Sequence, residues 1–181
     1  MHDPGGKSIL KIPFGIEGLC AFRGMNDEHR MWLLRRKSAA PVDAPFALWC
    51  GMTPSTASEY SDDMTIRKEC TWTWMMGLER YIKVNVGTYR CTDPKLLNNV
   101  STRDLVHTVN LDMIAAMAIK ASKIVVACGD LPDVLEPFAK STFEALGVGR
   151  REVLCLGLTK RGWPRHSSRI GYATPLVEFK G

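Results

Sequence analysis

The sequence predicts an α/β fold, a three-layer α/β/α sandwich around a central four-stranded, mainly parallel sheet. Two observations lead to this prediction. Apolar runs of strand length alternate along the chain with longer segments that carry helix start and stop signals. The apolar runs also lack the polar–apolar alternation of a half-exposed strand, so they suit a sheet that is covered on both faces.

The 181 residues are expected to form a single domain, long enough to bury about 70% of the surface of the unfolded chain. Residues 45–181 hold the alternating pattern and are its predicted α/β core. Residues 1–44 are expected to be an irregular N-terminal segment with a short strand at "GLCAFRG". The run "RMWLLRRK" within it also has strand character, and the two prolines of "SAAPVDAP" indicate a connecting loop.

The strands predicted for the core share a continuous apolar character: they are 46–52, 81–86, 123–128 and 152–158. A helix is expected over 61–77, because Ser61, Asp62 and Asp63 suit its start and Gly77 its end. A second helix is expected over 110–122, which is rich in Ala, Met and Ile.

Proline and glycine mark the remaining helical segments. Asp93 and Pro94 predict a short helical turn, because proline suits the first helical position and aspartate caps it. A helical rather than catalytic role is therefore favoured for Asp93. Pro132 and Gly147 predict the start and the end of a helix over 131–147.

Parallel strands place their carboxyl ends at one edge of a sheet, where α/β proteins bind ligands. The segments expected at that edge share this position after a predicted strand: they are 51–55, 85–90, 128–130 and 159–168. The sequence therefore predicts a ligand crevice formed by four loops that are distant along the chain.

Composition limits the class of protein. The chain is 45% hydrophobic and 24% charged, and no apolar run approaches the roughly 20 residues that span a bilayer. We expect no membrane association, and the N-terminal sequence lacks the apolar core of a secretory signal. Six cysteines without a CxxC pair indicate reduced thiols and a cytoplasmic protein. We expect no cofactor and no metal, although a site assembled from distant cysteines stays an open alternative.

The formal net charge of +5 is unevenly distributed. Residues 153–177 contain no acidic side chain, and the basic side chains within them lie close together: Lys160, Arg161, Arg165, His166 and Arg169. Such a locally uncompensated segment attracts phosphate, either on a nucleotide or on a nucleic-acid backbone. The alternative is a solvated basic loop.

Several catalytic motifs are missing. Ser55 lacks the flanking glycines of a GxSxG nucleophile elbow, and no GxxxxGK[ST] phosphate loop follows a strand. "GVGRRE" precedes a strand instead of following one, so it is no dinucleotide fingerprint. Trp32, Trp72 and Trp74 are expected to serve packing rather than base stacking.

Three blocks of sequence carry a resemblance to a known family. They are "GMTPSTASEYSDDMTIRK", "VNVGTYRCTDP" and "LGLTKRGWPRHSSRIGYATPLV", and they cover roughly residues 45–178. In content and order they resemble domain of unknown function 1643, a family that occurs in bacteria and phages. The resemblance implies a bacterial or phage protein, and it implies no activity by itself.

The arrangement of the blocks is similar, more distantly, to the uracil-DNA glycosylase superfamily. In that superfamily a turn after the first inner strand holds the hydrolytic water, and a strand-end asparagine recognises the base. A motif after the last strand provides a histidine and grips the DNA. The resemblance therefore implies a glycosylase-like hydrolase that acts on an N-glycosidic bond, or a related base-modifying enzyme, with a nucleotide, a modified base or DNA as its partner.

This resemblance assigns roles to particular residues. The catalytic candidates are Thr53, Asp63 and His166. The substrate-binding candidates are Gly51, Met52, Pro54, Ser55, Asn85, Tyr89, Arg90, Trp163, Arg165 and Ser167. The phosphate-binding candidates are Lys160, Arg161 and Arg169.

Two departures from the pattern of these related families favour an alternative function. Related families place Asn or Asp at the position of Thr53, and His at that of Trp163. The alternative is a catalytically inactive nucleic-acid-binding module of the same fold. A third possibility is an unrelated nucleotide-processing enzyme with its site at the same strand ends. The sequence carries no signal of oligomeric state.

Overall fold

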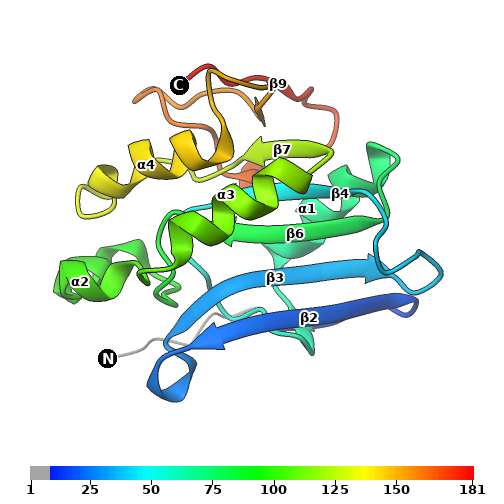
Figure 1. The fold of residues 1–181 in the computed structure, drawn as a ribbon, viewed down its shortest axis with the longest axis horizontal. Helices are drawn as coiled ribbons and strands as arrows, with labels where there is room; N and C mark the ends of the chain where they lie inside the picture. Colours follow the sequence, from blue (N-terminus) through cyan, green and yellow to red (C-terminus); the bar gives the residue numbers. More distant parts are fainter. Residues whose placement is uncertain (1–8) are drawn as a thin grey trace.

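A mixed sheet of seven strands forms the centre of the protein, described by a computed structural model over residues 9–181 (Figure 1). In spatial order its strands are β2 (Ile16–Arg23), β3 (His29–Lys37), β6 (Arg80–Asn85), β4 (Phe46–Gly51), β7 (Lys123–Val126), β8 (Leu154–Cys155) and β9 (Val177–Glu178). A separate two-stranded sheet joins β1 (Leu10–Lys11) to β5 (Ser61–Asp62). The protein therefore has a mixed α/β fold.

The helices lie between and beside these strands. The α-helices are α1 (Met64–Met75), α2 (Thr102–Leu105), α3 (Asn110–Lys120) and α4 (Glu136–Leu146). The 3-10 helices are η1 (Met25–Asp27), η2 (Pro94–Asn99) and η3 (Ser167–Arg169). In this part of the chain, no helix has the length and apolar content needed to cross a membrane.

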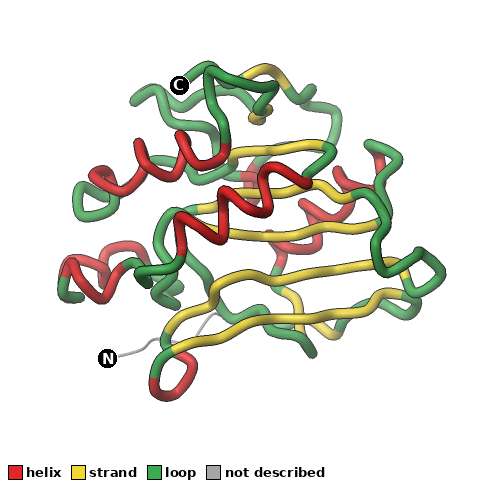
Figure 2. The backbone as a smooth tube through the Cα atoms, viewed as in Figure 1, coloured by secondary structure: helices red, strands yellow, loops and turns green. Residues whose placement is uncertain are grey.

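The four predicted core strands lie side by side as β6-β4-β7-β8, and their pairings are parallel. A four-stranded sheet is nevertheless wrong, because antiparallel strands extend it on both sides: β2 and β3 next to β6, and β9 next to β8. The strand predicted over 152–158 is also too long. After β8 the chain turns at Gly157, whose φ of 85° does not continue a strand. Figure 2 shows that loops dominate this last part of the chain.

Residues 9–44 of the N-terminal segment are more regular than the sequence indicated, while residues 1–8 lie outside the described residues. The strand character of "RMWLLRRK" is confirmed by β3, and "GLCAFRG" is part of a longer strand, β2. The two strands form a long antiparallel hairpin, and β3 pairs with β6. Gly18 lies inside β2, where a Cβ atom would come within 2.4 Å of the carbonyl oxygen of Glu59. The glycine thus allows close packing of two backbones, which the sequence alone does not reveal.

Polar residues cap the helices. Asp63 is the N-cap of α1, where its Oδ1 accepts the Ile66 N–H at 2.8 Å, and Asp93 caps η2 by accepting the Lys95 N–H at 3.0 Å. Gly147 ends α4 with a φ of 87°, as predicted. The predicted start of α4 at Pro132 is wrong, because Pro137 occupies the first turn of a helix that begins at Glu136.

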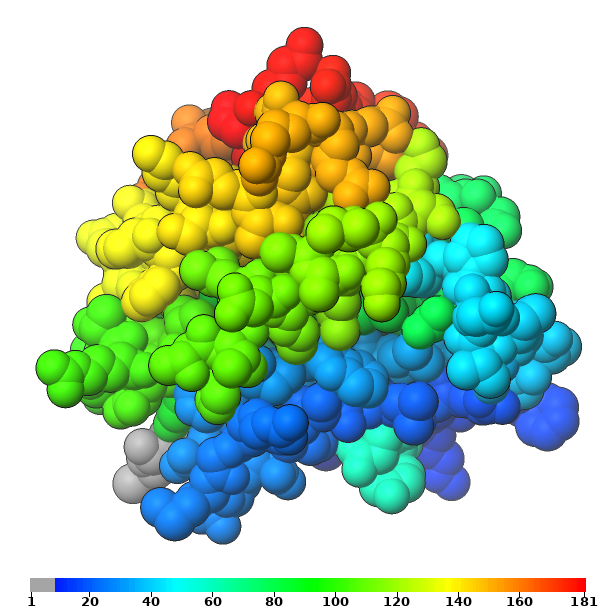
Figure 3. Space-filling model, in the orientation of Figure 1, coloured from blue at the N-terminus to red at the C-terminus, as the bar shows by residue number. Residues whose placement is uncertain are grey.

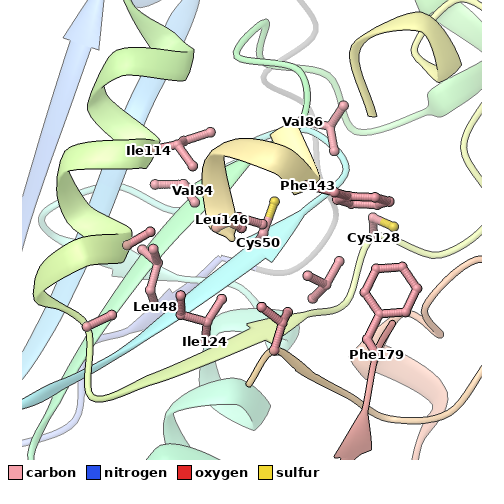
Figure 4. Close-up of a cluster of buried hydrophobic side chains, with 14 of the residues drawn as sticks. Leu48, Cys50, Val84, Val86, Ile114, Ile124, Cys128, Phe143, Leu146 and Phe179 are labelled. Carbon is pink, nitrogen blue, oxygen red and sulfur yellow. The ribbon is translucent and has the colours of Figure 1, made fainter. Parts of the chain in front are cut away.

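One face of the parallel strands packs against α3 and α4. This cluster is apolar throughout, and Figure 4 shows its side chains from both layers: Leu48, Cys50, Val84, Ile114, Ile124, Phe143 and Leu146. Figure 3 shows the atoms of α3 and α4 covering this face, while the blue β2–β3 hairpin stays visible below them.

The opposite face packs against α1. Trp49 and Tyr81 from the sheet contact a helix surface that includes Ile66 and Trp72. The Trp49 indole N–H donates to Thr73 Oγ1 at 3.0 Å, so even this part of the core contains polar contacts. All six cysteines are free thiols, and burial raises the pKa of Cys50 to about 12.

Candidate functional site

A cavity of about 990 Å³ lies at the carboxyl ends of β4 and β6, on the side of the sheet that carries α1. Its walls come from the turn after β4, the start of α1, the end of β6, the segment after β7 and the loop that contains η3. This is the edge at which the sequence predicted a crevice. Its lining includes the following predicted site residues: Gly51, Met52, Thr53, Ser55, Asp63, Asn85, Arg165, His166 and Arg169.

Other predicted site residues lie outside the lining. Pro54 is buried, and its carbonyl accepts the Cys91 N–H at 2.8 Å. Tyr89 is buried and meets His29 edge-to-face, with ring centroids 6.0 Å apart. Arg90 stacks over Phe22 and donates to the Asp27 carbonyl at 3.2 Å. These three side chains support the walls rather than face the cavity.

The predicted site residues within residues 153–177 also divide into those that line the cavity and those that do not. Arg161 forms an ion pair with Glu136 of α4 at 2.5 Å, and Asp133 lies 3.7 Å away. The expectation that its charge is locally uncompensated is therefore wrong, because its acidic partners come from an earlier part of the chain. Lys160 is exposed and lies outside the cavity lining, and Trp163 packs against Phe143 in the apolar cluster on the other face.

Asn85 ends β6 with its side chain almost fully buried, at 1% exposure. Neither its Nδ2 nor its Oδ1 has a hydrogen-bond partner within residues 9–181. Asn110, at the start of α3, donates to the backbone carbonyl of Asn85 at 3.2 Å and so fixes the strand end. A buried amide without partners is costly, and Asn85 lines a cavity in which a ligand can supply them.

Gly51 leaves space for two polar side chains at the floor of the cavity. A Cβ atom at this position would lie 2.7 Å from Lys83 Nζ and 2.9 Å from Asn85 Oδ1. The glycine that ends β4 is therefore required by close approach of two polar side chains from β6.

His166 lies at the start of η3. Its Nδ1 accepts the Ser168 backbone N–H at 3.2 Å and lies 2.8 Å from Ser168 Oγ. Burial, followed by the nearby Lys83 charge, lowers the pKa of His166 below its usual value. The ring is therefore neutral at pH 7, and with Nδ1 as an acceptor its proton is on Nε2.

Sequence reasoning missed a buried ionic network below the cavity. Glu69 of α1 is fully buried, and both its oxygens lie 2.8 Å from Lys83 Nζ. Tyr81 donates to Oε2 at 2.6 Å, and Ser167 donates to Oε1 at 2.8 Å. The network joins α1, β6 and the loop that carries His166. Its sequence signal was the lysine in the otherwise apolar strand "YIKVNV".

Arg30 was also missed. It lies near the start of β3, which runs antiparallel to β6 and so begins at the cavity edge. The side chain lines the cavity at 2% exposure, and its Nη1 donates to the Ala57 carbonyl at 2.9 Å. A charge at the start of the apolar run "RMWLL" was the available signal.

The lining carries more positive than negative charge. Its cations are Arg30, Lys83, Arg165 and Arg169, and its acids are Asp63 and Asp130. Within residues 9–181, no group of three or more His, Cys, Asp or Glu side chains is placed to hold a metal ion. The site is thus suited to an organic anion with hydrogen-bonding edges.

The fold and this site define a mixed α/β protein with a polar, cationic cavity at the carboxyl edge of its parallel strands. The chain belongs to the family described as "Protein of unknown function (DUF1643)", which matches residues 30–167. No curated protein matches the sequence.

Proposed function

We propose that the protein recognises a nucleobase in this cavity and hydrolyses the N-glycosidic bond that joins the base to its sugar. The observation that carries the proposal is the buried amide of Asn85, which has no hydrogen-bond partner in the described part of the chain. A primary amide offers one donor group and one acceptor side by side, which matches the paired donor and acceptor on the edge of a base. Enzymes that act on a base recognise it by such edge contacts.

His166 is proposed to stabilise the leaving group. When the bond from C1′ to the base nitrogen breaks, the electron pair goes to the base, and negative charge develops on its ring and carbonyl oxygen. A neutral imidazole with its proton on Nε2 donates a hydrogen bond to that oxygen without needing to lose its own proton. The lowered pKa of His166 supports this role.

Water completes the reaction: its oxygen bonds to C1′ and keeps one proton as the new hydroxyl group, and its other proton passes through an acid–base group to the base. Thr53 and Asp63 line the same cavity and are the proposed groups that hold this water. Oδ1 of Asp63 already caps α1, which leaves Oδ2 for this task.

We further propose that β6-β4-β7-β8 corresponds to the four-stranded sheet of the uracil-DNA glycosylase superfamily, and that the protein acts in the cytoplasm on modified bases.

A catalytically inactive binding module is the second candidate. The observation that favours it is Thr53, since a hydroxyl orients water less strongly than a carboxylate at the same turn. Both candidates require base recognition by Asn85, and they differ only in whether base is released.

Base release tests the two candidates directly. Nucleosides, nucleotides and oligonucleotides with common and modified bases are incubated with the protein, and free base is measured by chromatography. We expect release by the wild-type protein and loss of release in His166→Ala. Asn85→Ala should weaken ligand binding by about 10-fold or more, whereas Asn98→Ala, an exposed control, should not. Binding without release of any base would favour the inactive module.

A further inference from the structure

Two buried cations line the cavity, and their environments differ. Lys83 is 3% exposed, and its ammonium group is neutralised by both oxygens of Glu69 at 2.8 Å. Arg30 is 2% exposed, and within residues 9–181 no carboxylate oxygen lies within 4.0 Å of its guanidinium nitrogens. One buried charge therefore has its counter-ion within the protein, and the other has none among the residues that the structure describes.

The Arg30 guanidinium also lacks some of its hydrogen-bond partners in the described chain. Its Nη1 donates to the Ala57 carbonyl, and Nε is buried with no partner in the described chain. Taking a charge out of water costs several kcal/mol when nothing compensates it, and a guanidinium carries five N–H donors. Because Arg30 lines the cavity, a bound anion is able to supply both the charge and the acceptors.

We propose that the cavity binds a free nucleotide whose terminal phosphate pairs with Arg30. This inference rests on the proposed recognition of a base by Asn85, because it assigns base and phosphate to two parts of one cavity. A guanidinium holds a phosphate through two parallel hydrogen bonds, which suits a single buried arginine.

The burial of Arg30 favours a free nucleotide as the ligand over a nucleotide inside a nucleic-acid chain. An internal phosphodiester continues into a nucleotide on each side, and both continuations would have to leave the cavity beside a side chain that is 2% exposed. A terminal phosphate has no such requirement. Arg165 and Arg169 are exposed and line the same cavity, so they contribute positive potential nearer to solvent.

The test compares ligands that differ only in phosphate. Binding of the common nucleosides, their 5′-monophosphates and trinucleotides with the same central base is measured by calorimetry on the wild-type protein. The same series is measured on Arg30→Gln and on Arg23→Gln, an exposed arginine of β2 outside the cavity lining. Inorganic phosphate is titrated separately, with the thermal midpoint as its readout.

We expect the monophosphate to bind wild type and Arg23→Gln at least about 10-fold more tightly than its nucleoside, as for a hydrogen-bonded charge pair. Arg30→Gln should lose this difference while it keeps the affinity for the nucleoside. Inorganic phosphate should raise the thermal midpoint of wild type and not that of Arg30→Gln, because an anion that binds only the folded state stabilises it.

Equal affinity of wild type for nucleoside and monophosphate would overturn the inference, as would a trinucleotide that binds more tightly than the monophosphate. These comparisons use the wild-type protein, so they test the binding of a free nucleotide even if Arg30→Gln does not fold. Failure of base recognition has a different signature. Phosphate would still bind through Arg30, but affinity would not depend on which base is present.

Discussion

The two faces of the parallel strands are both buried under helices, yet they bury different kinds of side chain. Against α3 and α4 the sheet presents Leu48, Val84 and Ile124. Against α1 it presents Lys83 and Asn85 beside the apolar residues. Successive side chains of a strand point to opposite faces, so β6 alone contributes to both.

The comparison separates stability from function. Apolar burial stabilises the fold with no demand on partners, whereas a buried ion must be paired and a buried amide must be hydrogen-bonded. On the α1 face Lys83 is paired with Glu69, but Asn85 and the Arg30 Nε are not satisfied within the described chain. The unsatisfied groups line the cavity, which is why we assign them to a ligand.

The largest effect should come from removing the counter-ion on the α1 face. Glu69→Leu leaves the Lys83 charge buried without its partner, and it also removes the acceptor of Ser167. We expect a loss of about 3–5 kcal/mol in the free energy of unfolding, measured by urea denaturation. The double variant Glu69→Leu with Lys83→Met should recover most of this loss. If the double variant is no more stable than the single one, the buried charge is not the cause.

On the apolar face, Leu48→Ala should lower the free energy of unfolding by roughly 3 kcal/mol. Leu48 is fully buried among side chains of two layers, so truncation removes apolar contact and leaves a hole. The exposed Leu96→Ala, in η2, is the control and should change stability by less than about 0.5 kcal/mol. Similar losses in the two variants would contradict the position of the core.

Gly51→Ala should have an intermediate effect. The added methyl group collides with Lys83 Nζ and Asn85 Oδ1, so the cavity floor has to shift at a cost of about 1–3 kcal/mol. Gly77→Ala is not a matched control because of its positive φ, whereas Gly171→Ala adds a methyl group in open space. Ligand affinity should fall in Gly51→Ala and stay unchanged in Gly171→Ala.

Acid should destabilise the protein through two histidines at this edge of the sheet, by less than the core variants do. Burial lowers the pKa of His29 and of His166, with further lowering by His107 and by Lys83 respectively. The unfolded chain, with a histidine pKa of about 6.5, therefore binds protons at a higher pH than the folded protein. Stability should be full above about pH 6.5 and fall as the pH drops through the folded-state values. Urea unfolding between about pH 7.5 and pH 5.5 measures this, and His29→Asn should flatten the profile.

Asn85→Ala should have the smallest effect on stability and the clearest effect on binding. It removes two buried polar atoms that have no partner in the described chain, so the free energy of unfolding should stay unchanged or rise. The same variant should bind a nucleobase ligand weakly. A large loss of stability would show that the amide is hydrogen-bonded within the protein. The proposed recognition of a base by Asn85 would then have no support.

Much of the core was visible in the sequence because its signals are local. The strand positions followed from continuous apolar runs, and Asp63, Asp93 and Gly147 act at helix ends as their chemistry predicts. Both strands of the N-terminal hairpin had sequence signals, but their pairing with each other and with β6 was not visible. The glycines of the hairpin serve close packing at Gly18 and a turn at Gly24, whose φ is 83°, and both uses depend on contacts through space.

The sequence by itself determined which segments meet at the ligand edge, because parallel strands place their ends together. Thr53, Asn85 and His166 accordingly line one cavity. Only the tertiary structure decided which charges are neutralised. Arg161 is paired by Glu136 and Lys83 by Glu69, while Arg30 is buried without a carboxylate in the described chain. Charges pair through space across segments that are far apart in sequence, so their balance is fixed by packing and not by local composition.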